Sequence, residues 1–135
     1  MDWEFVVSEK MSTENFLNII KQSFVSPTVE NRSPQLLYLS GLGFSCSWEE
    51  EREEDKNNQF SNYYVIKDNF GLKHTYRCYI QVFSSYSGDE DNLWYMMRFI
   101  GNMLKQTQGD TLLIFNGEKP IVYRHYDQIC VAPGV

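Results

Sequence analysis

Short stretches of this chain alternate apolar and polar residues with a period of two, as strands do when one face is buried. In the first stretch, Trp3, Phe5 and Val7 share one face. An Asn116-Gly117 pair near the C-terminus favours a hairpin, because both residues tolerate a positive φ. The predicted strands cover residues 3–7, 36–39, 44–48, 63–66, 73–83, 112–115, 121–123 and 129–131.

Two longer segments carry apolar residues at helical spacing instead. The first begins at Ser12 or Thr13, whose hydroxyl can cap free amide groups, and ends before Ser26-Pro27. Its apolar stripe is Phe16, Leu17, Ile20 and Phe24. The second runs from about Asp89 to Gln106, with the stripe Leu93, Met96, Met97, Ile100 and Leu104.

The connections between these elements complete the predicted fold. Asp68–Gly71 reads as the turn of a hairpin between residues 63–66 and 73–83, and residues 27–34 as a polar connection. The element order is β-α-β-β-β-β-α-β-β-β. Short turns join consecutive strands, which favours an α+β fold with a mainly antiparallel sheet and two helices packed on one face. Residues 1–135 are expected to form one domain.

The composition is that of a folded, acidic protein. Apolar residues make up 42% and aromatic residues 16% of the chain, and the formal net charge is −6. Without a cluster of Lys and Arg, nucleic acid and membrane surfaces are poor partners, whereas a basic protein is a better one. No signal peptide opens the chain, so we expect a cytoplasmic protein with Cys46, Cys78 and Cys130 as reduced, core or near-core thiols.

Sequence motifs for catalysis or cofactor binding are weak. Gly41 and Gly43 form a lone Gly-x-Gly that is followed by a strand, not by a helix. His74 and His125 are 51 residues apart and lack zinc-ligand spacing, and on a strand His74 and Cys78 would be about 13 Å apart, too far for proton transfer. We therefore expect no metal, no cofactor and no enzyme activity. A small hydrolase with Asp, Glu and His converging across the sheet remains an alternative.

An acidic run interrupts the strand pattern after Trp48. It is expected to be a solvated loop or strand extension, and it allows two interpretations. The simpler one is a solvated face that protects an edge strand. The other is an anionic surface that binds a basic partner. The candidate partner-binding residues are Glu49, Glu50, Glu51, Glu53, Glu54 and Asp55.

Several tyrosines allow the same two interpretations. Tyr is enriched at protein interfaces, but for each of these residues alone an ordinary half-buried position in a sheet is the simpler explanation. These residues are Tyr63, Tyr64, Tyr86, Tyr95 and Tyr126.

The C-terminal segment resembles a known family. Residues 109–124, Gly-Asp-Thr-Leu-Leu-Ile-Phe-Asn-Gly-Glu-Lys-Pro-Ile-Val-Tyr-Arg, follow a helix that carries Met97, Ile100 and Leu104. This arrangement is similar to the ending of small bacterial immunity proteins of polymorphic toxin systems, chiefly the swarming-inhibition type and more loosely the contact-dependent growth inhibition group. The opening strand and helix also fit the family, whereas residues 49–55 have no counterpart in it.

The resemblance implies tight, stoichiometric binding to a cognate toxin C-terminal domain inside the producing cell. Many such toxins are nucleases, whose surfaces are basic, so an acidic inhibitor would be attracted to them. The partner-binding residues rest on charge alone. A non-enzymatic adaptor that binds another cytosolic protein is the alternative function.

Overall fold

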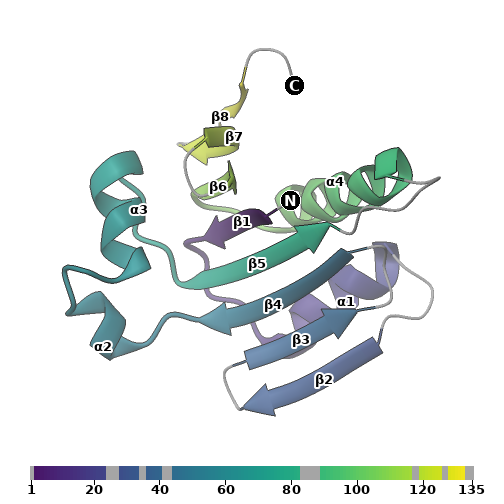
Figure 1. Ribbon diagram of the computed structural model, residues 1–135, viewed down its shortest axis with the longest axis horizontal. Helices are drawn as coiled ribbons and strands as arrows, with labels where there is room; N and C mark the ends of the chain where they lie inside the picture. The colour runs from purple at the N-terminus through teal and green to yellow at the C-terminus, as the bar shows by residue number, and fades with distance from the viewer. Residues whose placement is uncertain are drawn as a thin grey trace.

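The computed structural model describes residues 2–23, 28–33, 36–40, 44–82, 89–116, 119–125 and 128–132 (Figure 1). Within these residues, eight strands form one antiparallel sheet. The strands are β1 (Asp2–Val7), β2 (Thr28–Ser33), β3 (Leu36–Ser40), β4 (Phe44–Glu50), β5 (Tyr76–Val82), β6 (Thr111–Phe115), β7 (Lys119–His125) and β8 (Gln128–Val131). The helices are α1 (Thr13–Ser23), α2 (Glu53–Lys56), α3 (Asn62–Phe70) and α4 (Asp89–Gln106).

The first strand of the chain lies in the middle of the sheet. The strand order is β2-β3-β4-β5-β1-β6-β7-β8, so β1 is hydrogen-bonded to β5 on one side and to β6 on the other. The segment from β2 to β5 and the segment from β6 to β8 flank it as two antiparallel runs. Both edges of β1 are therefore paired with other strands.

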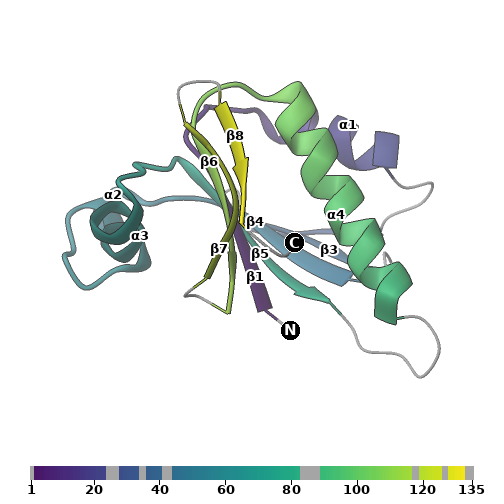
Figure 2. The ribbon, with the colours of Figure 1, turned by 90° about the horizontal axis from the view of Figure 1, so that it is seen from above.

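The main core lies between one face of the sheet and the helices α1 and α4 (Figure 2). Phe16 of α1 stacks on Trp48 of β4, with ring centroids 4.1 Å apart, and meets Phe99 of α4 edge-on at 6.1 Å. The amide of Asn15 donates to the Ser12 hydroxyl, which confirms the predicted cap of α1. The predicted α+β class is confirmed, with α1 and α4 packed against each other on one face of the antiparallel sheet.

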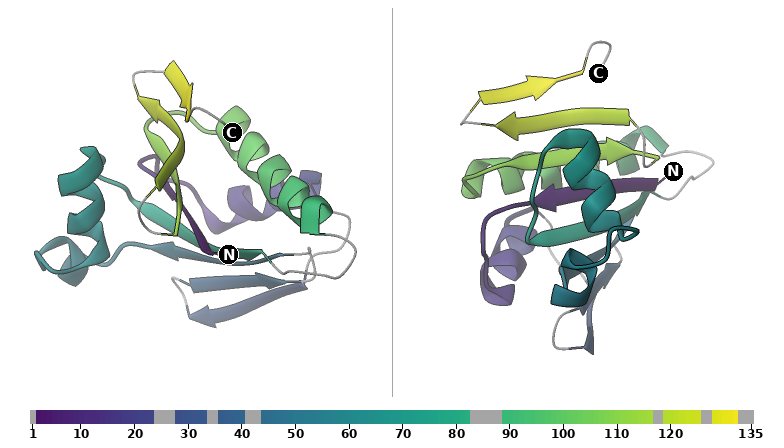
Figure 3. Two further views of the ribbon diagram at one scale, coloured as in Figure 1. Left: turned by 45° about the horizontal axis from the view of Figure 1, so that its top comes forward. Right: turned by 90° about the vertical axis from the view of Figure 1, so that its left-hand side faces the viewer.

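A second, smaller core covers part of the opposite face. It is formed where α3 packs over the middle strands, as both views of Figure 3 show. Its buried residues are Val6, Ile66, Leu72, Leu112 and Ile114, with Phe70 packed against them. The sequence pattern did not predict this core, because residues 63–66 were assigned to a strand and residues 68–71 to a turn.

The predicted strand at residues 63–66 is wrong, since these residues belong to α3. Tyr63, Ile66 and Phe70 follow the i, i+3, i+7 spacing of one helical face, and that face packs toward the sheet. Gly71, expected in a hairpin turn, is the C-cap of this helix with φ of 70°. A glycine in the left-handed region thus marks a helix end here.

Residues 27–34 also differ from the predicted polar connection. Thr28–Ser33 form β2, which pairs only with β3 and lies at the edge of the sheet. An edge strand can be polar throughout, so it carries no alternation for the sequence to display. Strand β5 begins at Tyr76, three residues later than expected. The Gly-x-Gly at residues 41–43, Phe24 of the first apolar stripe, residues 117–118 of the hairpin, Tyr86 and Tyr126 lie outside the described residues.

The cysteines lie largely where the sequence placed them. Cys46 and Cys78 are buried in the main core, and Cys130 on β8 is partly buried. Burial raises the pKa of the Cys78 thiol well above its ordinary value, and the adjacent Cys46 acts in the same direction. In the part of the chain that the structure describes, no helix is both long and apolar enough to cross a membrane.

The second core yields a test of the α3 assignment. Truncation of the buried Ile66 to Ala should cost about 2–4 kcal/mol of unfolding free energy, because it leaves a cavity under α3. The neighbouring Val65 is exposed, so Val65→Ala should cost less than about 0.5 kcal/mol. Urea unfolding of both variants measures the difference, and equal losses would contradict the packing of α3.

Candidate functional site

The acidic segment leaves the sheet at the end of β4 and enters the short helix α2. Glu49 and Glu50 are the last residues of β4, as a strand extension predicts, but Glu53–Lys56 form a helix, which the sequence pattern did not predict. Arg52 is the extended N-cap of α2. The side chains of Glu53 and Glu54 are 85% and 71% exposed. Two acidic side chains of this segment therefore project into solvent.

Two basic residues partly neutralise the segment. The Arg52 guanidinium lies 3.2 Å from Glu54, 3.5 Å from Asp55 and 3.9 Å from Glu49, and Lys56 lies 3.6 Å from Glu53. Such exposed pairs contribute little to stability. Six acidic side chains still face only two basic ones across residues 49–56, so the segment keeps a net negative charge.

Glu51 differs from its neighbours because its side chain lies inside the protein. It is 5% exposed, and one of its oxygens is 2.8 Å from Nε2 of His74, whose side chain is fully buried. The ring of Tyr63 from α3 packs at 5.3 Å from the imidazole. The pair thus joins the start of residues 51–56, here called the α2 segment, to the residues that precede β5.

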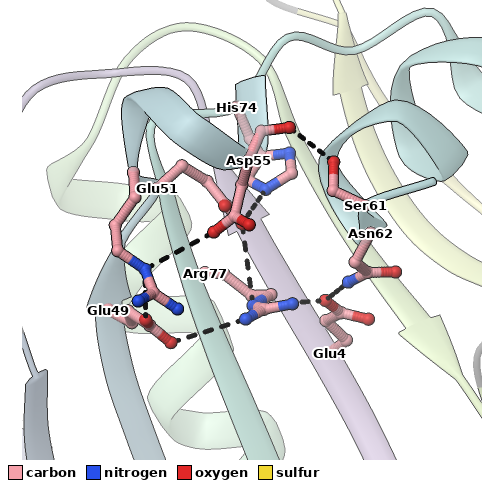
Figure 4. Close-up of polar contacts among 9 residues, drawn as sticks. Glu4, Glu49, Glu51, Asp55, Ser61, Asn62, His74 and Arg77 are labelled. Carbon is pink, nitrogen blue, oxygen red and sulfur yellow. Dashed lines mark hydrogen bonds and ion pairs between the residues drawn. The ribbon is translucent and has the colours of Figure 1, made fainter. Parts of the chain in front are cut away.

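Arg77 of β5 connects this pair to the sheet (Figure 4). Its Nε is 3.7 Å from both Glu51 and Glu4, and its Nη2 is 3.4 Å from Glu49. Glu49 and Arg77 are direct cross-strand partners, and Glu4 comes from the central strand β1. One guanidinium therefore holds three carboxylates from two strands and the segment that leaves β4.

Helix α3 is attached to the same cluster. The side-chain amide of Asn62 donates to Glu4, and the Ser61 hydroxyl donates to the Asp55 carbonyl at 2.6 Å. The Glu51 amide donates to the Thr75 carbonyl, and the Thr75 amide donates to that of Val7. Helices α2 and α3 are thus fixed to the sheet by charged side chains and by the backbone.

The two most enclosed carboxylates respond to the cluster in opposite directions. Burial raises the pKa of Glu4 above 4.5, although the Arg77 charge and the Asn62 hydrogen bond act against this shift. Burial would also raise the pKa of Glu51, but the hydrogen bond and charge of His74, with the charges of Arg77 and Arg52, outweigh it and lower the pKa below 4.5. Glu51 is therefore the stabilising carboxylate of the cluster, and Glu4 is the more costly one to bury as an anion.

The cluster has the composition of a catalytic site but not its access. His74 and Glu51 are enclosed beneath α2 and α3, so a substrate cannot reach them in this conformation. A cavity of about 330 Å³ does open at the end of α3, away from this cluster, and both apolar residues (Phe70, Leu72, Leu112) and polar ones (Thr111, Arg124, His125) line it. Across the described residues, no group of three His, Cys, Asp or Glu side chains could hold a metal ion. The arrangement favours a structural role, in which the cluster holds the α2 segment against the sheet.

The structure separates the six candidate residues by role. Glu53 and Glu54 are exposed, Glu49, Glu50 and Asp55 are half-buried, and Glu51 is buried. Sequence reasoning missed Glu4, Asn62, His74 and Arg77 as parts of this cluster. The one available signal was Arg77, the only charged residue of β5, and it is weak because Arg77 lies on the outer face of the strand with Tyr79 and Gln81.

Residues 109–124 lie directly before the last part of the sheet. They include β6 and β7, and Asn116 has the positive φ of 52° that the hairpin signal requires. Arg124 donates to the carbonyls of Leu104 and Gly109 and to the Thr107 hydroxyl, which closes the C-terminal end of α4. Comparison of the chain with protein-family models, curated proteins and solved structures finds no significant match.

Neutral substitutions should distinguish the two enclosed carboxylates. Glu51→Gln removes the charge that His74 and Arg77 stabilise, so we expect it to lower the unfolding free energy by about 1–2 kcal/mol at pH 7. Glu4→Gln keeps an acceptor for Asn62 and removes a buried charge, so its cost should be below about 0.5 kcal/mol or reversed. Denaturant titration at pH 7 compares them, and a larger loss in Glu4→Gln would refute this assignment.

The pH dependence of stability should follow the same logic. Because the folded-state pKa of Glu51 is lowered, its contribution is complete above 4.5 and is lost as the pH falls through the lower folded value. The stability advantage of the wild type over Glu51→Gln should therefore be constant from pH 7 to 5 and shrink below 4.5. The raised pKa of Glu4 predicts the opposite trend for Glu4→Gln. Acidification protonates Glu4 and removes the cost of burying its charge, so the stability of the wild type relative to Glu4→Gln should increase as the pH falls. Urea midpoints at several pH values test both trends.

Proposed function

We propose that this chain is an immunity-type protein that neutralises a cognate bacterial toxin domain by stoichiometric binding. The observation that carries the proposal is the acidic α2 segment, which exposes Glu53 and Glu54 while Glu51 fixes it to the sheet. The resemblance of residues 109–124 to the endings of immunity proteins supports the same class of function. The partner is a toxin C-terminal domain with a basic surface, such as that of a nuclease, and binding takes place in the cytoplasm of the producing cell.

Charge supplies the physical basis of the recognition. An enzyme that holds nucleic acid needs a positive surface to bind phosphates. A negative surface on its inhibitor is attracted to that region, which accelerates association, and once bound it excludes the substrate. The net charge of −6 extends this attraction beyond the contact itself.

The buried cluster contributes through rigidity. Glu51 and Asn62 fix the chain immediately before and after the segment that contains α2, so the acidic side chains start from an ordered backbone. Less conformational entropy is then lost on binding, and more of the interaction energy appears as affinity. A charged network placed beneath an exposed segment supports this role.

A co-expression experiment tests the proposal directly. The C-terminal domain encoded by the gene immediately upstream is expressed with and without this chain. We expect the domain alone to arrest growth, the chain to restore growth, and the two to purify as a 1:1 complex. Toxicity that the chain fails to relieve would exclude neutralisation of that domain and favour the adaptor function.

Charge reversal then tests the acidic surface. Glu53→Lys with Glu54→Lys should slow association with the toxin domain about tenfold at low salt, and the effect should diminish above physiological ionic strength. The control is Glu14→Lys with Glu30→Lys, which changes the net charge equally on exposed residues of α1 and β2. Stopped-flow association rates at several salt concentrations compare them. Equal slowing in both double variants would show that only overall charge matters.

A further inference from the structure

The turn between α2 and α3 presents a single large apolar side chain to solvent. Phe60 is 85% exposed, the most exposed of the large hydrophobic side chains in the described residues. Exposed apolar residues are common on protein surfaces, and exposure alone gives no function. The backbone that carries Phe60, however, is tightly organised.

Hydrogen bonds on both sides of Phe60 fix the turn. Its own amide donates to the side-chain oxygen of Asn58 at 3.0 Å, and the next amide, that of Ser61, donates to the Asn58 carbonyl at 3.0 Å. The Ser61 hydroxyl closes the turn onto the Asp55 carbonyl of α2. An aromatic side chain is therefore held outward on an ordered backbone, and its two χ angles are the main freedom left to lose on binding.

The charged residues nearest to Phe60 along the chain precede it, on α2. Glu53 and Glu54 lie on the preceding helix, while residues 57–62 carry no charged side chain. The surface is thus an apolar projection next to a negative helix. A second copy of the chain is a poor occupant, because its own acidic helix would meet a like charge.

We propose that Phe60 is the apolar anchor of the interface, and that it inserts into an apolar pocket bordered by Lys or Arg side chains on the cognate toxin domain. This inference rests on the proposed function and names the surface that performs it. The aromatic ring provides most of the apolar area buried at the centre of the contact, and the carboxylates of α2 meet the basic border of the pocket. Recognition by this projection requires no contact with the buried cluster beneath it.

Truncation of the ring tests the anchor. Phe60→Ala should weaken binding to the upstream-encoded toxin domain at least tenfold, mainly through faster dissociation, because burial of a phenyl ring typically contributes more than one power of ten in affinity. The variant should keep the wild-type unfolding midpoint, since the ring makes little contact with the fold. Trp94→Ala is the matched control, because Trp94 is an aromatic residue of α4 that is 57% exposed. It should leave the affinity unchanged.

A second variant tests the role of the ordered turn. Asn58→Ala keeps Phe60 but removes the acceptor of its amide, so we expect a smaller loss of affinity, about threefold, with the ring still required. Surface plasmon resonance with the purified toxin domain gives both rate constants, and sedimentation confirms that each variant keeps the oligomeric state of the wild type.

The outcomes distinguish failure of the Phe60 anchor from failure of the proposed immunity function. If the wild type neutralises the toxin and Phe60→Ala binds equally well, the anchor is refuted while the immunity function stands. If Trp94→Ala weakens binding and Phe60→Ala does not, the interface lies on α4. If the wild type fails to bind or neutralise the domain, the proposed function fails, and the anchor that depends on it fails as well.

Discussion

The position of β1 at the centre of the sheet is the constraint on which the rest of the structure depends. Strand β1 has a neighbouring strand on each edge and packed residues on each face. Its side chains, apart from those at the ends of the strand, therefore lie inside the protein. Phe5 and Val7 are buried on the side of α1 and α4. On the other side Val6 is apolar but Glu4 is not, so a buried carboxylate needs partners.

That division along one strand determines how the α2–α3 region is attached. Next to Val6, α3 packs through Ile66 in the second core. Next to Glu4, the same helix packs through Asn62, and Arg77 bridges to Glu49 and Glu51. The apolar contact supplies most of the burial energy, whereas the polar contacts fix the position of the chain. A segment without an apolar residue of its own can therefore leave the sheet and remain ordered.

In the proposed function, the buried cluster holds the α2–α3 region in place but does not itself touch the toxin domain. The acidic side chains of α2 and the ring of Phe60 lie between the fixed points at Glu51 and Asn62, and they are exposed. Charged surfaces govern the rate of encounter, and a buried aromatic ring governs the lifetime of a complex. The acidic charge and the exposed ring follow each other along one short piece of chain.

The sequence by itself determined the elements whose burial follows a simple period. The alternation in β1 and β4, the apolar run of β6, the apolar stripes of α1 and α4, and the hairpin residue Asn116 were all sufficient, because each is a local pattern. It also located the acidic run and its charge. Only the tertiary structure decided that Tyr63–Ile66 turn into a helix and that Glu51 is buried, because both depend on contacts with residues distant in the chain. The helix forms where Ile66 can pack on β1 and β6, and the carboxylate is buried where His74 and Arg77, more than twenty residues away, can compensate its charge.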